Sequence, residues 1–311
     1  MELSRNSRIV ERLFLKRDLL AAGDPSHETI RPVLLILGGG MRGASGAGAA
    51  HALHLLGLGQ AFDVVIGIST GAGISSCFLS GRETVALNAS IYYEELTQGV
   101  FNMLGLFGKS VTDIDVIERV IRSGKKRVRT EEIHASRSEF FVGVTDYHEV
   151  TPILIDAKRA TPDPIMAVKA SMAIPGLYKG TVEVNGRRYV DGSVNPFPIR
   201  TVMEQFHPTD ILVIANCTHE SGKNREPTPA EKLTSLYYMK DVPSALRIMW
   251  TSRFERWQTG LEEFRALNNN VHTGILWAPT KLHMFTTHSG KLRHASERAH
   301  EETFRAFNKQ P

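Results

Sequence analysis

The amino-acid sequence predicts an α/β fold in which a central, mainly parallel sheet is flanked by helices. Residues 32–37 ("PVLLIL") form a continuous apolar run of the kind found in strands that are buried on both faces of a parallel sheet. Small residues and helix formers follow at residues 44–59. The pattern then repeats, with a strand candidate at residues 62–69 and a helix candidate at residues 70–81. This alternation of strands and helices is typical of parallel α/β proteins.

Further strands are predicted at residues 139–147, 151–157 and 210–217, where apolar and β-branched residues gather. Within residues 181–192, Asn185 and Gly186 separate two alternating runs, and this pattern predicts a hairpin.

The chain divides into three parts. Residues 1–28 are predicted to be an N-terminal helical extension, and residues 29–225 the α/β domain. From residue 226 to residue 311 the chain is rich in helix formers and aromatic residues, apart from a strand candidate at residues 274–279. We expect this helix-rich part to pack on the same domain.

The composition excludes several classes of protein. The chain has 311 residues, of which 42% are hydrophobic, and its 37 Lys and Arg barely exceed its 33 Asp and Glu. So weak a basic balance gives no indication of nucleic-acid binding. Cys77 and Cys217 lack the spacing of metal ligands and fit a reducing compartment. With no secretory signal and no apolar segment of ~20 residues, the sequence predicts a cytoplasmic protein.

A basic run at Arg122–Arg129 ("RSGKKRVR") has two interpretations. Such a run meets anionic lipid head groups in some proteins, which keeps a peripheral membrane contact open. More often it is a solvated surface loop.

The three consecutive glycines of residues 38–43 ("GGGMRG") also have two interpretations. Their spacing matches the dinucleotide-binding fingerprint, in which glycines let the backbone approach a pyrophosphate. Alternatively, the loop offers backbone N–H groups as an oxyanion hole for a nucleophile elsewhere in the chain.

A second motif supplies that nucleophile. Gly67, Ser69 and Gly71 form a G-x-S-x-G sequence between a strand candidate and a helix candidate. Glycines on both sides permit the sharp turn that lifts a serine side chain clear of the backbone at a helix N-terminus. Asp191, followed by Gly192 at the end of another strand candidate, is the candidate base. In a parallel sheet, the loops at the carboxyl ends of neighbouring strands meet, so we expect these motifs to converge.

These motifs, in this order, resemble those of the patatin-like phospholipases. "GGGMRG" is similar to the family's oxyanion loop, "GISTG" (residues 67–71) to its serine elbow and "DG" (residues 191–192) to its aspartate motif. A fourth stretch, "KASMAIPGLY" (residues 169–178), is similar to the family's segment of small residues that ends in proline and an aromatic residue. The resemblance spans about residues 32–216. One departure is Ser193, which stands where the family usually has glycine or alanine.

The resemblance implies a patatin-like fold and a lipid acyl hydrolase that cleaves esters of phospholipids, lysolipids or similar compounds. It assigns Ser69 as nucleophile and Asp191 as base of a Ser-Asp dyad that works through an acyl-enzyme, with no cofactor and no metal. The implied oxyanion loop comprises Gly38, Gly39, Gly40, Met41, Arg42 and Gly43. For Arg42, a salt bridge that fixes the loop is an equal alternative to a role in the oxyanion loop.

Three rival functions fit parts of the pattern. An α/β-hydrolase triad needs nucleophile, acid and histidine in that order, which is met by Ser69, by Asp191 or Asp210, and by His283 or His288. A nucleotide-binding oxidoreductase needs an acid at the end of the second strand, whereas Asp63 begins it. A catalytically silent lipid-binding protein would merely retain the fold.

Two groups of side chains stay open between a structural and a functional role. His51 and His54 are spaced like ordinary helix residues, and a third metal ligand is not obvious. Trp250, Phe254 and Trp257 follow helical spacing, which favours a place in the core over the lining of an acyl cleft.

Overall fold

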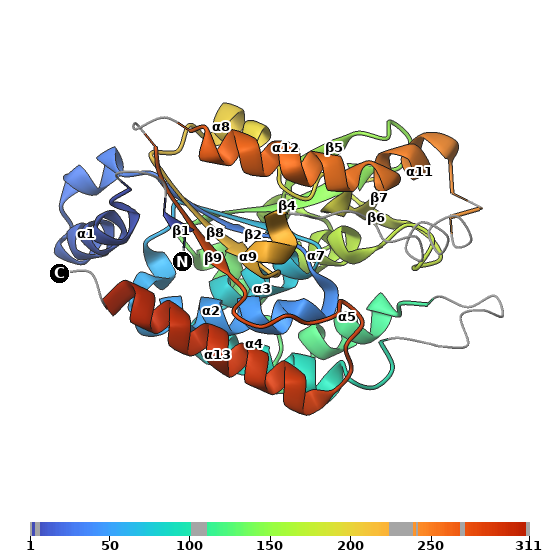
Figure 1. The fold of residues 1–311 in the computed structure, drawn as a ribbon, viewed down its shortest axis with the longest axis horizontal. Helices are drawn as coiled ribbons and strands as arrows, with labels where there is room; N and C mark the ends of the chain where they lie inside the picture. The colour runs from blue at the N-terminus through green and yellow to red at the C-terminus, as the bar shows by residue number, and fades with distance from the viewer. Residues whose placement is uncertain are drawn as a thin grey trace.

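A nine-stranded sheet runs through the middle of the described part of the protein, with helices on both of its faces (Figure 1). The structure is a computed structural model that describes residues 2–3, 7–100, 111–223, 239–240, 242–267 and 271–308. The strands are β1 (Glu2–Leu3), β2 (Pro32–Ile36), β3 (Val64–Ile68), β4 (Glu139–Asp146), β5 (Pro152–Asp156), β6 (Val182–Val184), β7 (Arg187–Asp191), β8 (Asp210–Ala215) and β9 (His272–Trp277).

The α-helices of the described residues connect and cover these strands. They are α1 (Ile9–Ala22), α2 (Gly43–Leu55), α3 (Thr70–Leu79), α4 (Arg82–Ser90), α5 (Ile114–Arg122), α6 (Thr130–Ala135), α7 (Pro164–Met172), α8 (Ile199–Phe206), α9 (His219–Lys223), α11 (Ser244–Thr251), α12 (Arg253–Arg265) and α13 (Ser289–Asn308). None of them is both long enough and apolar enough to cross a membrane.

The sheet has a parallel centre with antiparallel additions. Strands β9, β8, β2, β3 and β4 lie side by side in parallel, whereas β1, β5, β6 and β7 pair in antiparallel fashion. The predicted α/β class with a mainly parallel sheet is therefore confirmed. The hairpin is confirmed too: Asn185 and Gly186 connect β6 to β7 and both have positive φ, at 52° and 74°.

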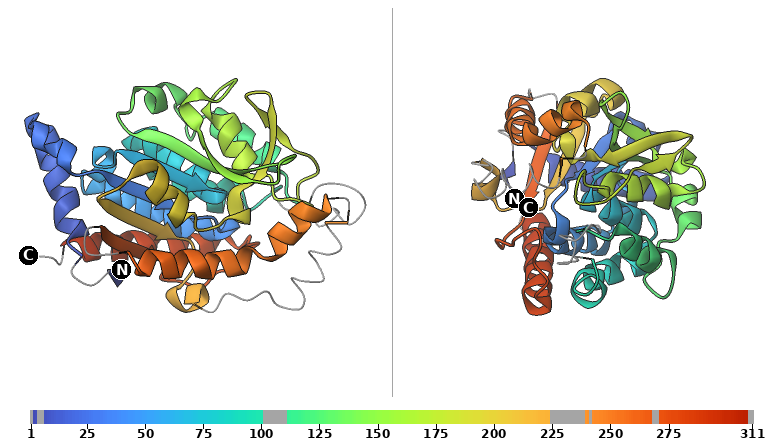
Figure 2. Two further views of the ribbon diagram at one scale, coloured as in Figure 1. Left: turned by 90° about the horizontal axis from the view of Figure 1, so that it is seen from above. Right: turned by 90° about the vertical axis from the view of Figure 1, so that its right-hand side faces the viewer.

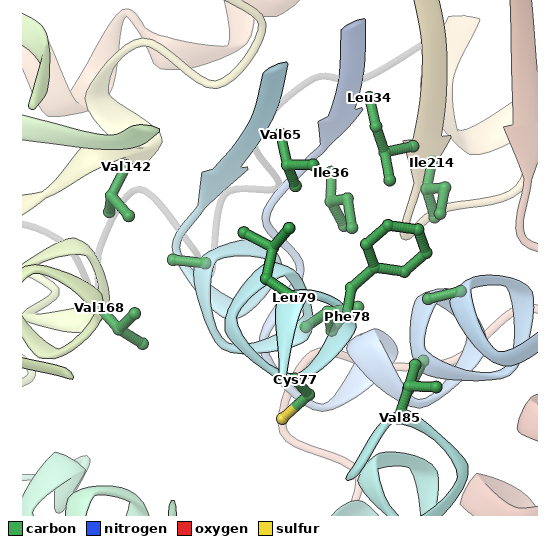
Figure 3. Packing of buried hydrophobic residues seen from close by; sticks show 14 of the residues in the cluster. Leu34, Ile36, Val65, Cys77, Phe78, Leu79, Val85, Val142, Val168 and Ile214 are labelled. Atoms are coloured by element: carbon green, nitrogen blue, oxygen red, sulfur yellow. The ribbon is translucent and has the colours of Figure 1, made fainter. Parts of the chain in front are cut away.

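Side chains of the central strands alternate between two hydrophobic cores. Leu34 and Ile36 of β2 face one side, where they pack with Phe78 of α3 and its neighbours (Figure 3). Val33 and Leu35 face the other side and pack in a second cluster with residues of α8 and α12. Because both faces are covered, these strands are apolar along their whole length, and this is why the sequence marked them clearly.

The ends of β3 and β7 meet on one edge of β4. On that strand, β5 pairs with Phe141–Thr145, β3 with Glu139–Gly143 and β7 with Val144–Asp146. A strand edge accepts one partner at each point, and β5 overlaps both of the others. Strands β3 and β7 therefore share the opposite edge in succession, and the residues that end them come together.

The N-terminal helix is anchored to the rest of the molecule by a buried lysine. Lys16 of α1 is 1% exposed, and its Nζ donates to the carbonyl oxygens of His27 and Ile30 and to Asp63 Oδ2, at 2.7, 2.7 and 2.9 Å. Ile9 of the same helix belongs to the main hydrophobic cluster. The segment predicted as an extension thus contributes to the core.

The C-terminal part supplies elements to the central layers. Strand β9 pairs with β8, and helix α13 packs along α2 so closely that a Cβ atom on Gly48 would clash with the carbonyl of Ser296. Helices α11 and α12 extend along the opposite face of the sheet, and α11 and α1 lie at opposite ends of the molecule (Figure 2). Residues 226–238 of the predicted C-terminal part lie outside the described residues, so the boundary at residue 225 stays a prediction.

Candidate active site

The candidate nucleophile lies at a sharp turn between β3 and α3. Ser69 has φ 53° and ψ −125°, a backbone conformation that is rare for a residue with a side chain. The flanking glycines make this turn possible: a Cβ atom on Gly67 would clash with Ala72, and one on Gly71 with the carbonyl oxygen of Ile36. The local geometry is that of a nucleophile elbow, in which strain is held by close packing around it.

Ser69 and Asp191 are in direct contact, as their positions at the ends of β3 and β7 require. Ser69 Oγ donates to Asp191 Oδ2 over 2.8 Å, and the N–H of Ser193 donates to Asp191 Oδ1 over 2.6 Å. Asp191 is 0% exposed, and this burial raises the pKa of its carboxyl from 3.8 to about 6. Hydrogen bonds from Ser193 and Ser69 act in the opposite direction. The carboxylate is therefore a stronger base than an exposed aspartate.

A further serine fixes the elbow, and sequence reasoning did not single it out. The N–H of Ser69 donates to Ser171 Oγ over 2.8 Å, and Ser171 Oγ donates in turn to the carbonyl of Gly143 over 2.5 Å. Ser171 lies on α7 and is fully buried. Ser171 belongs to the segment of small residues at 169–178 that resembles a segment of the family. Nothing in that segment distinguishes Ser171 from its neighbours as a residue that holds the elbow.

The glycine-rich loop lies directly against the serine. A Cβ atom on Gly38 would be 3.1 Å from Ser69 Cβ. Among the described residues, the N–H groups of Gly38, Gly39 and Gly40 have no hydrogen-bond acceptor. Three of the predicted donors are used elsewhere, among them the N–H of Arg42, which donates to the carbonyl of Gly39 over 3.3 Å. The N–H of Met41 donates to the carbonyl of Met284 over 3.0 Å, and that of Gly43 to carbonyls of its own helical turn.

Two side chains hold this loop from opposite ends. Arg42 Nε donates to the carbonyl of Gly39 over 3.0 Å, so this arginine contacts the loop through a hydrogen bond to its backbone, and the expected salt bridge stays a prediction. Asn216, just beyond β8, donates to the carbonyl of Leu37 over 2.7 Å and accepts the N–H of Gly46 over 3.0 Å. Asn216 was missed in the sequence, although it follows a strand whose carboxyl end lies at this edge of the sheet.

Two hollows of different character meet at Ser69. The larger is an open cleft of about 1190 Å³, and the smaller is a mostly apolar pocket of about 60 Å³. Ser69, Gly40, Ile174 and Met284 line both. Trp250, Phe254 and Trp257 are largely buried, which agrees with a place in the core, and they also line the open cleft. That they line an acyl site stays a prediction.

The acids of the rival functions lie at the opposite end of the sheet. Asp210 begins β8 and is bound through both carboxylate oxygens by Arg12, at 2.7 and 3.0 Å. Asp63 immediately precedes β3 and contacts Lys16 and Arg137. Neither acid is available for a triad or for a ribose at the carboxyl ends of the strands.

The remaining candidates have structural partners. The His51 ring packs on His300 with centroids 5.0 Å apart, and His54 Nε2 is 2.7 Å from the carbonyl oxygen of Phe78. Four residues of the basic run form ion pairs with carboxylates: Arg122 with Glu118 and Asp163, Lys126 with Glu94 and Glu95, Arg127 with Glu131, and Arg129 with Glu83. These pairs neutralise much of its charge and favour the surface-loop interpretation.

Comparison with known proteins gives a family for this fold and this arrangement of motifs. The chain is similar to VipD from Legionella pneumophila, with 13% identity and a TM-score of 0.43, over 89% of this chain and 67% of that one. It is also similar to a chain of the complex of full-length SpcU with full-length ExoU from the type III secretion system of Pseudomonas aeruginosa. There the identity is 15% and the TM-score 0.32, over 75% of this chain and only 53% of that one.

Among curated proteins, none matches this sequence. The family model for patatin-like phospholipase matches residues 34–203, which is more than half of the chain and includes the glycine loop, the serine elbow and Asp191. The chain belongs to the patatin-like phospholipase family.

Proposed function

We propose that this protein is a lipid acyl hydrolase that cleaves carboxylic esters with a Ser69–Asp191 dyad. The observation that carries the proposal is the direct 2.8 Å hydrogen bond from Ser69 Oγ to the buried Asp191. The bond lies at a strained elbow, beside backbone N–H groups that have no acceptor within the described part of the chain. A nucleophile, a base in contact with it and donors for an oxyanion are the parts that acyl transfer requires.

The chemistry follows from these positions. Ser69 Oγ attacks the ester carbonyl carbon while its proton passes to Asp191, and the N–H groups of Gly38–Gly40 stabilise the negative charge on the carbonyl oxygen. Asp191 then gives the proton to the departing alcohol, which leaves an acyl-enzyme on Ser69. Water attacks this ester, loses a proton to Asp191, and the fatty acid departs as Ser69 Oγ recovers the proton.

The surroundings of the dyad suit a lipid ester. The small pocket is lined by apolar side chains that include Leu96, Ile114 and Ile117, and it opens at Ser69. The larger cleft is also lined by Ser69 and carries charged groups. An ester bound at Ser69 would therefore direct its acyl chain to the apolar side and its polar part to the cleft.

The arrangement favours a dyad over a triad. A triad places a histidine between nucleophile and acid. Here the serine hydroxyl donates to the aspartate itself, and among the described residues no histidine is hydrogen-bonded to either group. His283 lines the cleft, but its Nδ1 accepts the N–H of Phe285.

Labelling with a lipid-like fluorophosphonate tests the proposal. We expect one adduct, on the Ser69 peptide, and none on Ser69→Ala. The same substitution should lower kcat/KM for an acyl ester by about 10⁴-fold or more, because no other group forms the acyl-enzyme. Mass spectrometry and ester hydrolysis give the two readouts, and near-ultraviolet circular dichroism checks that the variant is folded. An adduct that persists on Ser69→Ala, or hydrolysis that survives it, would refute the assignment.

A catalytically silent lipid-binding protein is the alternative from another class. It predicts binding of a lysolipid by the folded wild-type protein without adduct and without turnover. The contact between Ser69 and Asp191 favours the enzyme, because lipid binding alone has no use for a strained serine beside a carboxylate of raised pKa.

A further inference from the structure

The apolar pocket beside Ser69 contains a buried pair of hydroxyl groups. Thr70 Oγ1 and Tyr92 Oη lie 2.6 Å apart, and either oxygen can be the donor of the hydrogen bond between them. Thr70 is 8% exposed and Tyr92 is 5% exposed. Both residues line the pocket of about 60 Å³ that Ser69 also lines. Polar groups that are buried in this way usually have all the hydrogen-bond partners they need.

This pair lacks one partner. Each hydroxyl group has one hydrogen atom to donate, and the bond between the two groups uses only one of these hydrogen atoms. Within the described part of the chain, neither oxygen takes part in a further hydrogen bond. Burial raises the pKa of Tyr92, so its hydroxyl keeps its hydrogen atom at any pH at which an esterase is assayed. One O–H group of the pair is therefore buried without an acceptor, which is costly unless the pocket contains one.

A third hydroxyl in the same wall has no partner at all. Thr112 lines the pocket and is 5% exposed, and its Oγ1 forms no hydrogen bond to any residue that the structure describes. The wall otherwise includes apolar side chains such as those of Leu96, Ile114 and Ile117, which cannot accept a hydrogen bond. An oxygen atom inside the pocket would supply the partner that these hydroxyl groups lack.

The hydroxyl pair lies close to where the ester would react. Thr70 follows Ser69 in the chain, so their Cα atoms are about 3.8 Å apart. A Cβ atom on Gly43, which ends the glycine loop, would be 2.6 Å from Thr70 Oγ1 and 2.5 Å from Tyr92 Oη. Tyr92 belongs to a short π-helical segment, Ile91–Glu95, and such segments are frequent at functional sites. An oxygen atom bound by the pair would therefore belong to one of the first carbon atoms beyond the ester carbonyl.

We propose that the pocket binds the acyl part of β-hydroxyacyl esters, and that the hydroxyl groups of Thr70 and Tyr92 select these esters by hydrogen bonding to the β-oxygen. A β-hydroxyl group accepts the unused hydrogen atom of the pair, while the rest of the acyl chain lies along the apolar wall. The β-hydroxyl takes no part in bond making or breaking. The inference rests on the proposed acyl hydrolase function and deepens it, because it names the chemical class of the acyl group.

The test compares the p-nitrophenyl esters of hexanoic acid and of the two enantiomers of β-hydroxyhexanoic acid. The enantiomers have the same intrinsic reactivity, so a preference of the wild-type protein for one of them reports on the site. In Thr70→Val/Tyr92→Phe, which removes both hydroxyl groups at nearly constant shape, kcat/KM for the favoured enantiomer relative to the hexanoate should fall by roughly fivefold to fiftyfold. Tyr93→Phe is the matched control, because Tyr93 lies on the same segment, packs against Arg293 and does not line the pocket.

The absence of a preference between the enantiomers in the wild-type protein would overturn the proposal, whether or not the double variant folds. That result is expected if the hydroxyl pair merely binds a water molecule, for which the pocket has room. An equal loss of activity on all three esters in a folded double variant would overturn it too, because damage to the elbow affects every ester alike.

Failure of the proposed function gives a different result, in which the wild-type protein hydrolyses none of the three esters. The pocket is then tested by calorimetric binding of the free acids to Ser69→Ala. This variant should bind one enantiomer of β-hydroxyhexanoate more tightly than hexanoate, and the difference should disappear when Thr70→Val and Tyr92→Phe are added. Equal affinity of Ser69→Ala for the hydroxylated and the plain acid would refute the role of the hydroxyl pair.

Discussion

The hydrogen bond between Ser69 and Asp191 joins two residues that are 122 positions apart in the chain. At the scale of these residues, the proposed chemistry depends on a carboxyl group that is costly to ionise. Burial raises the pKa of Asp191 to about 6, while bonds from the backbone N–H and the side chain of Ser193 lower it. Ser193, the one departure from the family's usual motif, therefore contacts the carboxylate directly.

The pH dependence of activity tests this balance. Asp191 accepts a proton only when it is ionised, so we expect kcat/KM to be low below pH 6, to rise through about pH 6 and to level off above it. Ser193→Ala removes a hydroxyl that stabilises the ionised form, so the rise should move to higher pH. Ser289→Ala, whose hydroxyl donates to the carbonyl of Tyr93 instead, should leave the profile in place. A profile that moves to lower pH in Ser193→Ala, or stays where it is, would contradict this account.

At the scale of elements, the elbow depends on how closely α3 approaches the end of β2. Gly71 on α3 leaves no room for a Cβ atom because the carbonyl oxygen of Ile36 is already there. Two residues further on, Gly73 faces only the methyl end of Met172, at 2.7 Å from a Cβ atom. The two glycines look alike in the sequence, but one faces rigid backbone and the other a flexible side chain.

Alanine at these two glycines should therefore give different results. Gly71→Ala pushes helix and strand apart, and we expect it to destabilise the protein by about 3 kcal/mol or more and to abolish fluorophosphonate labelling. Gly73→Ala should change the free energy of unfolding by less than about 1 kcal/mol, since Met172 can move and alanine favours the helix. Urea unfolding of both variants gives the comparison. Equal tolerance at the two positions would mean that the close approach at Ile36 is not what the elbow requires.

The elements were predictable from the sequence where their residues form a local pattern of apolar or glycine residues. The buried strands β2, β3 and β8 were found because both of their faces are apolar. Ser69 and Asp191 were singled out as candidates because glycines and strand ends surround them. Ser171, Asn216 and Met284 were not, because each acts through a bond to a backbone group that is distant in sequence, and no local pattern records such a bond.

At the scale of the whole molecule, the N-terminal and C-terminal parts are joined through the same sheet. Strand β1 pairs with β9, α1 packs against the main core, and the buried Lys16 ties α1 to Asp63 at the start of β3. The three parts distinguished in the sequence thus share one set of layers. We therefore expect the loss of one of these contacts to lower the stability of all three parts.

Replacing Lys16 tests how strongly the N-terminal helix is coupled to the rest. Lys16→Met leaves the carbonyls of His27 and Ile30 without their donor and Asp63 with Arg137 alone, so we expect a loss of about 2–4 kcal/mol in stability. Arg8→Met, which removes an exposed pair with Glu11, should cost less than about 1 kcal/mol. All three tryptophans lie between residues 250 and 277, so their fluorescence reports on the C-terminal part. A transition there that is insensitive to Lys16→Met would show that α1 unfolds independently.

The bond from the N–H of Met41 to the carbonyl of Met284 has a consequence for the order of events during synthesis. A chain emerging from the ribosome contains Ser69 and Asp191 long before residue 284 has been added, but its glycine loop then lacks the partner that holds Met41. We therefore expect a nascent chain to acquire esterase activity only after the ribosome has passed this methionine. On this expectation, the proposed lipid hydrolase would stay inactive while it is unfinished, because of the position of one peptide group late in its sequence.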